Sequence, residues 1–168
     1  MLGYVISDDR DDRNARMADL AMALMADGWR LAGAVQTNSR PGHDCACDVD
    51  LSVLGHLGPP IRISQALGAG ARGCRLDPDG LERAVAQVSR TLTARTDLLI
   101  VNKFGKQEAL GRGFRPAIGD ALAEGVPVLL TVAPAYLAEF LDFAGELAQR
   151  LEWPEVERWA RQVRAAAA

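Results

Sequence analysis

The sequence predicts one α/β domain with three layers, built around a mostly parallel sheet. Short, almost wholly apolar runs at Leu2–Ile6, Asp97–Asn102 and Val126–Val132 are typical of strands that are covered on both faces. Segments with helical spacing of apolar residues alternate with these runs. The chain has 168 residues, of which 49% are hydrophobic, so we expect residues 1–168 to form a single domain.

The first elements follow a strand–helix–strand order. Leu2–Ile6 predicts a buried strand, and Asn14–Ala26 predicts an amphipathic helix that Asp11 or Asp12 would cap. Leu31–Val35 predicts a second strand after a tight turn. Two strands joined by a helix within this length favour a parallel pair with a right-handed crossover.

The middle of the chain predicts a short antiparallel excursion. Gln36–Gly73 is rich in Gly and Pro, and extended segments are expected at Asp48–Val53 and Ile61–Ser64. A helix should open at residues 77–79, because Pro suits a first turn and Asp79 with Glu82 has the spacing of a capping box.

The last part of the chain returns to alternating strands and helices. The uninterrupted apolar run Asp97–Asn102 predicts the central strand of the sheet. The other expected elements are a helix at Phe114–Glu124, the strand Val126–Val132, a helix at Tyr136–Leu147, and an amphipathic helix from residues 153–154 to about Val163, with Ala165–Ala168 fraying.

Composition excludes several functional classes. The net charge is −3 and most basic residues are scattered, so we expect neither nucleic acid nor an anionic membrane as a partner. No apolar run reaches about 18 residues, and the N-terminus lacks the features of a signal peptide. Three cysteines do not make a disulfide framework, so a cytoplasmic location with reduced thiols is expected.

Ligands of parallel sheets bind beyond the carboxyl ends of the strands, which directs attention to Ser7–Arg13, Asn102–Arg115 and Ala133–Tyr136. The first of these segments lies where a phosphate-binding P-loop would be. It has neither the glycines nor the lysine of such a loop, and its four aspartates would repel phosphate. The sequence therefore predicts a solvated, helix-capping acidic turn there, with a cation site as the alternative.

The segment after the central strand is the most informative in the chain. It contains Lys103, Lys106, Arg112 and Arg115 together with three glycines. Lysine and arginine bind anions, glycine permits close backbone approach, and the helix expected from Phe114 would add N–H donors. The pattern predicts an anion or nucleotide contact that also includes Asn102, and the alternative is a solvated basic loop.

Five segments of the chain resemble an uncharacterised bacterial domain family. The resemblance rests on residues 47–51, 62–65, 73–77, 101–108 and 111–115, and it covers nearly the whole chain. Members of that family are often labelled nucleoside-triphosphatase-like or molybdenum-transport-associated ATPase-like. The resemblance therefore implies a nucleotide- or oxyanion-related function.

A more distant resemblance is to the small thermophilic and cancer-related nucleoside triphosphatases. That family implies a P-loop fold with a hairpin excursion, and a central strand that ends in acidic residues. Here Asn102 occupies the position of the magnesium-organising Asp, Lys103 that of the catalytic Glu, and Glu108 matches a later Glu. Asn lacks the anionic charge that helps to organise magnesium, and protonated Lys cannot act as a base, so ordinary hydrolysis is not expected.

Other polar residues give weaker signals. Ser64 and Gln65 are candidates for a second wall of the anion pocket. His43, Cys45, Cys47 and Cys74 are weak candidates for a metal site, because Cys-x-Cys is closer than the usual zinc spacing; buried or inert cysteine is the favoured interpretation.

The sequence thus favours a degenerate P-loop-fold protein that binds a small anion, either a nucleotide phosphate or an oxyanion such as molybdate. One alternative is a metal-dependent phosphohydrolase that uses Glu108 or the acidic loop. Another is a protein-interaction module without a ligand. The cofactor stays unknown, and Trp153 and Trp159 leave a homo-oligomer contact open, although a packed C-terminal helix is simpler.

Overall fold

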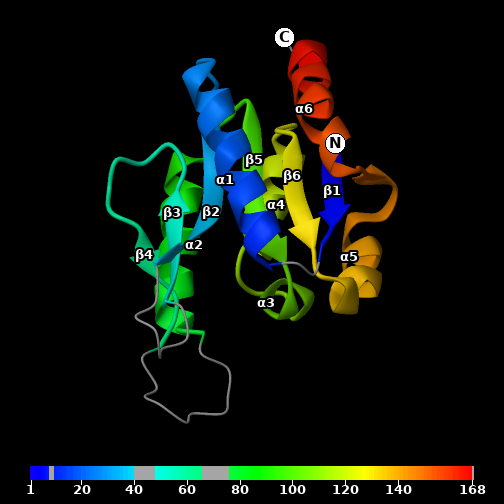
Figure 1. The fold of residues 1–168 in the computed structure, drawn as a ribbon. Helices are drawn as coiled ribbons and strands as arrows, with labels where there is room; N and C mark the ends of the chain where they lie inside the picture. The colour runs from blue at the N-terminus through cyan, green and yellow to red at the C-terminus, as the bar shows by residue number, and fades with distance from the viewer. Residues whose placement is uncertain (8–9, 40–47, 66–75, 168) are drawn as a thin grey trace.

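The structure, a computed structural model, describes residues 1–7, 10–39, 48–65 and 76–167. Its strands form one mixed sheet in the order β4-β3-β2-β5-β6-β1-β7 (Figure 1). β1, β2, β5, β6 and β7 are joined by parallel pairings, whereas β3 and β4 are antiparallel additions at one edge. The strands are β1 (Leu2–Ile6), β2 (Leu31–Ser39), β3 (Asp48–Val53), β4 (Ile61–Arg62), β5 (Leu98–Phe104), β6 (Val128–Val132) and β7 (Ala148–Arg150).

Helices cover both faces of the sheet, so the expected three-layer α/β fold with its antiparallel excursion is confirmed. α1 (Arg10–Ala26) and α6 (Trp153–Ala167) lie on one face, and α2 (Pro78–Thr91), α4 (Arg115–Ala123) and α5 (Leu137–Ala144) lie on the other (Figure 1). The short α3 (Lys106–Ala109) lies beyond the carboxyl end of β5. Among the described residues, no helix combines the length and apolar character needed to cross a membrane.

The central strand β5 explains this layering. Leu98 and Ile100 belong to the apolar cluster beneath α1 and α6, whereas Leu99 and Val101 belong to the cluster beneath α2 and α4. All four side chains are fully buried. Successive side chains of a strand point to opposite faces, so an uninterrupted apolar run requires a cover on each side.

Two expected helix caps are wrong. α1 begins at Arg10, so Asp11 and Asp12 lie inside the helix and cannot occupy the residue before it. α2 is capped by Asp77, whose side chain accepts a hydrogen bond from the backbone N of Asp79 at 3.1 Å. The Asp-Pro-Asp sequence offers two carboxylates as caps, and the helix uses the first because Pro78 then takes the N1 position.

The segment after β6 is more divided than the single helix expected at Tyr136–Leu147. A 3₁₀ turn (Pro134–Tyr136), α5, a second 3₁₀ turn (Gly145–Leu147) and β7 follow one another, and β7 pairs in parallel with β1. A three-residue strand carries too little periodicity to be found in a sequence. α6 continues to Ala167, so the fraying expected from Ala165 is not seen in its described part.

The tryptophans of α6 pack within the chain. Trp159 is buried at 4% exposure and donates its indole N–H to Gln149 on β7 at 2.9 Å. Arg16 of α1 lies over the ring of Trp153, 5.5 Å from its centre. The packed C-terminal helix is therefore confirmed, and a homo-oligomer contact stays a prediction.

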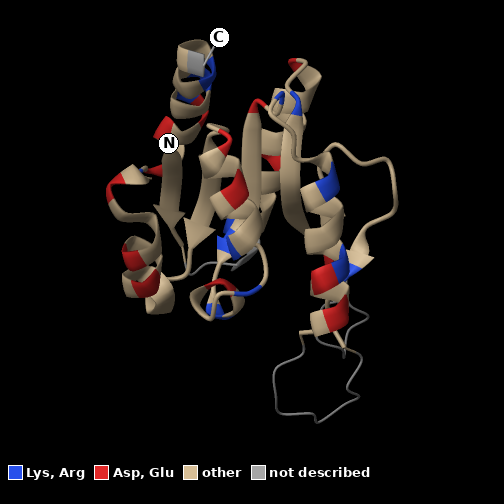
Figure 2. Ribbon diagram, turned by 180° about the vertical axis from the view of Figure 1, so that it is seen from behind, with Lys and Arg blue, Asp and Glu red and all other residues tan. Residues whose placement is uncertain are grey.

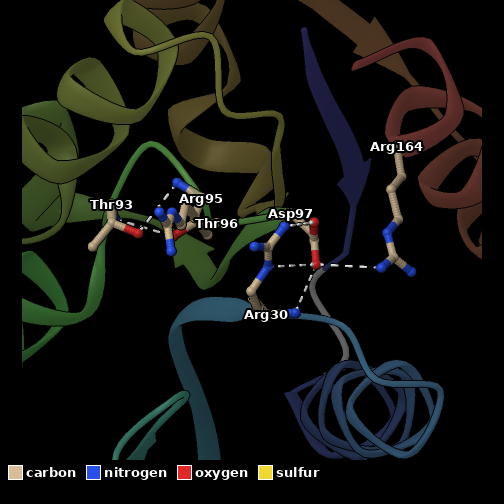
Figure 3. A network of polar contacts seen from close by, with 6 residues as sticks. All are labelled: Arg30, Thr93, Arg95, Thr96, Asp97 and Arg164. Atoms are coloured by element: carbon tan, nitrogen blue, oxygen red, sulfur yellow. Dashed lines mark hydrogen bonds and ion pairs between the residues drawn. The ribbon is translucent and has the colours of Figure 1, made fainter. Parts of the chain in front are cut away.

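An ionic network around Asp97 lies at the amino ends of the parallel strands, just before β5 (Figure 3). Asp97 accepts hydrogen bonds from the backbone N of Arg30 at 2.8 Å and from its Nη2 at 3.0 Å, and Arg164 of α6 lies 3.6 Å away. Partial burial alone would raise the pKa of the Asp97 carboxyl. The hydrogen bonds from Arg30 and the charges of Arg164 and Arg30 outweigh burial, and the pKa is lowered.

Gly33 of β2 should not tolerate a side chain. Its φ is +113°, and a Cβ there would lie 1.9 Å from the carbonyl oxygen of Ile100 on β5. We expect Gly33→Ala to lower the free energy of unfolding by more than about 3 kcal/mol, because it adds a backbone clash to left-handed strain. Gly28→Ala is the matched control: its φ is +77° with nothing within 4 Å, so denaturant titration should show a loss of only about 1 kcal/mol.

Asp97→Asn tests the amino-end network. We expect it to lower the free energy of unfolding by about 1 to 2 kcal/mol at neutral pH, because Arg30 and Arg164 lose their charged partner. The folded pKa is below the unfolded one, so this stabilisation is present above about pH 4 and is lost as the pH falls through the folded pKa. Denaturant unfolding of the wild-type and Asp97→Asn proteins should show a smaller difference in free energy of unfolding at pH 3 than at pH 7. A gap that is equal at both pH values would contradict the assignment. The exposed pair Asp12–Arg16 offers a control, since Asp12→Asn should cost less than about 0.5 kcal/mol.

Candidate functional site

The cations expected after β5 lie around α3 at the carboxyl edge of the sheet (Figure 2). Lys103, Lys106 and Arg112 are exposed. Arg115 differs from them, because it is half-buried, lies over the ring of Phe143 on α5 at 4.5 Å and donates from Nη1 to the carbonyl of Glu108 at 3.3 Å. Three of the four predicted cations are therefore accessible to a ligand, and the fourth also ties α4 to α5.

Glu108 holds this segment in its conformation. Its carboxylate is 5% exposed, with Oε2 accepting from the backbone N of Gly105 at 3.0 Å and Oε1 from that of Phe114 at 3.1 Å. Burial raises the pKa of the Glu108 carboxyl, and the two backbone hydrogen bonds and the nearby charge of Lys103 lower it only in part. A single side chain thus joins the start of α3 to the start of α4.

The N-terminus of α4 has less capacity for a ligand than the sequence suggests. The backbone N of Phe114 is used by Glu108, and that of Arg115 donates to the carbonyl of Arg112 at 3.2 Å. Pro116 has no N–H. The expectation that this helix adds free N–H donors is therefore wrong for its first residues, because their N–H groups already donate to residues of the preceding loop.

Asn102 is the centre of a buried hydrogen-bond relay that joins four elements. Its Oδ1 accepts from the backbone N of Gln36 on β2 at 3.2 Å, and its Nδ2 donates to Oδ1 of Asn14 on α1 at 2.8 Å. Its carbonyl accepts from the hydroxyl of Thr131 on β6. Asn102 and Asn14 are only 5% and 4% exposed. The end of the central strand is therefore held to β2, α1 and β6.

The start of α1 contributes residues that sequence reasoning missed. Arg13 is 3% exposed, and its Nη1 donates to the carbonyl of Ser7 at the end of β1 at 3.0 Å. Asn14 contacts Asn102 as described above. Both residues fall at the end of the segment where a P-loop would be, and that position was the signal available. The four aspartates before them are the stronger signal in the sequence.

The second wall expected from Ser64 and Gln65 has a different arrangement. Ser64 is buried and its hydroxyl accepts from the backbone N of Val49 at 2.9 Å, so it joins β3 to the segment after β4. Gln65 is exposed. The candidate metal ligands His43, Cys45, Cys47 and Cys74 lie outside the described residues, and within the described ranges no three His, Cys, Asp or Glu residues are grouped as metal ligands would be.

Two surface grooves lie away from the carboxyl edge. One of about 540 Å³ runs along α6, lined by Pro154, Glu157, Arg158, Arg161, Gln162 and Ala165. The other, of about 520 Å³, lies between α2 and β4, where His56, Arg62, Arg83 and Arg90 are among its lining residues. Neither contains a residue of the segment after β5. A groove volume alone does not indicate a ligand, so the candidate site remains the segment after β5.

Glu108→Gln should loosen the segment after β5. Glutamine offers one acceptor oxygen, so its NH₂ would face one of the two backbone N–H groups that the carboxylate now accepts. We expect a loss of about 1 to 3 kcal/mol in the free energy of unfolding and faster amide exchange at Gly105 and Phe114. Gln107→Glu, a change of opposite sense at the neighbouring half-buried residue, is the control. Unchanged exchange at both amides in Glu108→Gln would contradict this role.

Comparison with solved structures confirms the fold. The crystal structure of THEP1 from the hyperthermophile Aquifex aeolicus matches 97% of this chain and 95% of its own, with a TM-score of 0.53 and 14% sequence identity. At that identity the match establishes the three-layer P-loop-type fold alone. It agrees with the distant resemblance that the sequence indicates.

A curated relative matches much more closely in sequence. The molybdenum import ATP-binding protein ModC 2 of Bradyrhizobium diazoefficiens is 37% identical over 154 residues, which are 90% of this chain and 17% of that protein. The chain therefore spans less than a fifth of the length of this relative. Residues 2–159 also match a family model, described as "Protein of unknown function (DUF2478)". The match spans almost the whole chain, and the protein belongs to the DUF2478 family.

Proposed function

We propose that this chain binds the phosphate groups of a nucleotide, or another small oxyanion, at the carboxyl edge of its sheet. The observation that carries the proposal is the exposure of Lys103, Lys106 and Arg112 on a segment that the buried Glu108 carboxylate holds in shape. Cations on an ordered backbone bind an anion with less loss of conformational freedom than cations on a mobile loop. Their position beyond the central strand is where ligands of parallel sheets bind.

Two further observations support a nucleotide as the anion. The fold is of the P-loop type, and the name of the relative at 37% identity describes an ATP-binding protein in molybdenum import. That name also makes molybdate a reasonable second anion to test. Fold and relationship supply only an analogy, and the three exposed cations are the direct support for an anion site.

The proposed binding is not accompanied by ordinary magnesium-dependent hydrolysis. Magnesium prefers oxygen ligands, commonly carboxylates, but the residue at the end of β5 is Asn102, whose only side-chain oxygen already accepts from Gln36. Lys103 follows it and is a cation at neutral pH. Glu108 has both oxygens engaged by backbone N–H groups, which leaves it poorly placed to act as a base.

Charge removal on the basic segment tests this function. We expect Lys106→Ala and Arg112→Ala each to weaken ATP or molybdate binding about tenfold, with little loss of stability, because both side chains are exposed. The wild-type protein should gain about 5 to 10 °C in Tm at a hundred times the Kd. Arg95→Ala removes an exposed cation at the opposite edge and should leave affinity unchanged.

Calorimetric titration of the three variants gives the decisive comparison. Equal affinity in Lys106→Ala, Arg112→Ala and Arg95→Ala would exclude the basic segment as the binding site. No binding of ATP, phosphate or molybdate to the wild-type protein would exclude the function itself and favour an interaction module. Steady phosphate release that depends on magnesium would show that hydrolysis occurs after all.

A further inference from the structure

We propose that the side-chain amide of Asn14 donates a hydrogen bond to an oxygen of the bound ligand, so that this part of the site accepts an oxyanion and not a metal cation. The inference rests on the proposed function and deepens it, because it names the atom that contacts the ligand and the sign of the charge that fits. It starts from a buried donor that has no partner in the described part of the chain.

The Nδ2 atom of Asn14 has no hydrogen-bond partner among the residues that the structure describes. The side chain is 4% exposed. A buried N–H group without a partner costs roughly 1 to 3 kcal/mol, and such groups are rare in folded proteins. A donor left open at this position therefore points to an acceptor that binds there.

The direction of the Asn14 amide is set by the backbone. The Gln36 N–H can only donate, so Asn102 must present its Oδ1 to it and its Nδ2 to Asn14. Asn14 must in turn present Oδ1 to Asn102. Its Nδ2, on the other side of the same amide, is thereby committed as a donor. The relay Gln36–Asn102–Asn14 thus fixes which kind of atom the site offers.

Two features near Asn14 favour an anion, and they act against the repulsion expected from the four aspartates of residues 7–13. Arg13, the preceding residue, carries a guanidinium buried at 3% exposure. Asn14 lies in the second turn of α1, a helix of 17 residues, and helical Cα–Cβ bonds tilt toward the N-terminus, whose partial positive charge attracts anions. Of the aspartates in this region, Asp12 forms an exposed ion pair with Arg16 at 2.7 Å, which offsets its charge.

The same relay provides a way to reverse the site. In an Asn102→Asp variant both side-chain oxygens accept hydrogen bonds, so Asn14 would have to donate Nδ2 to the new carboxylate and turn its Oδ1 outward. The offered atom would change from a donor to an acceptor, next to an added negative charge. That combination fits a divalent cation, and we expect this variant to gain Mn²⁺ binding that the wild-type protein lacks.

The first test uses Asn14→Asp, which keeps an acceptor for Asn102 and replaces the donor with a second oxygen. We expect at least a tenfold loss in affinity for inorganic phosphate and for ATP, both measured in EDTA. Ala15→Asp places the same charge on the next, exposed residue and should change affinity less than threefold. If Asn14→Asp does not fold, Asn14→Ala removes the same donor without added charge.

Nuclear magnetic resonance gives a readout that a merely structural role would not move. Adding phosphate to the wild-type protein should shift the side-chain NH₂ signals of Asn14, whereas Mn²⁺ should not broaden them. Equal affinities in Asn14→Asp and Ala15→Asp would overturn the assignment, as would Mn²⁺ broadening in the wild-type protein. Absence of any anion binding to the wild-type protein would overturn both this assignment and the proposed function. Wild-type binding that Asn14→Asp leaves unchanged would overturn the Asn14 assignment alone, so the two failures are distinguishable.

Discussion

Burial of the central strand on both faces is the constraint on which the rest of this molecule depends. Four consecutive apolar side chains of β5 are fully buried, so a helical layer must cover each side of the sheet. Asn102, the next residue of β5, is also buried, so this first polar side chain of the strand requires hydrogen-bond partners. It finds them on β2 and α1, while the hydroxyl of Thr131 on β6 satisfies its carbonyl. The geometry of the carboxyl edge is therefore a direct consequence of how the core is closed.

The features predicted correctly from the sequence are those with a strong local signal. The apolar runs identified β1, β5 and β6, and Pro78 after Asp77 marked the start of α2. The concentration of cations after β5 was also visible, and three of them are exposed as an anion site requires. Whether they bind a ligand stays a prediction, because exposure is necessary for that role but not sufficient.

The features that sequence reasoning missed depend on contacts between distant segments. β7 has three residues and exists because β1 offers an open edge beside it. The interaction between Asn14 and Asn102 spans 88 residues, and nothing in the segment around Asn14 indicates it. Glu108 looked like a candidate for chemistry, whereas its two oxygens meet backbone groups three and six residues away. Such pairings arise only when the fold brings the partners together.

The attachment of Lys103 to β5 itself has a kinetic consequence. Lys103 lies between Asn102, which is hydrogen-bonded to β2, α1 and β6, and Phe104, which pairs with Val132 of β6. A residue held by such neighbours is less mobile than one on an ordinary surface loop, which samples many positions within nanoseconds to microseconds. If the proposed site is correct, a ligand that meets Lys103 encounters a backbone that is already ordered, and recognition should be close to rigid-body docking. Association would then be limited by diffusion and charge attraction, with its rate falling as salt increases.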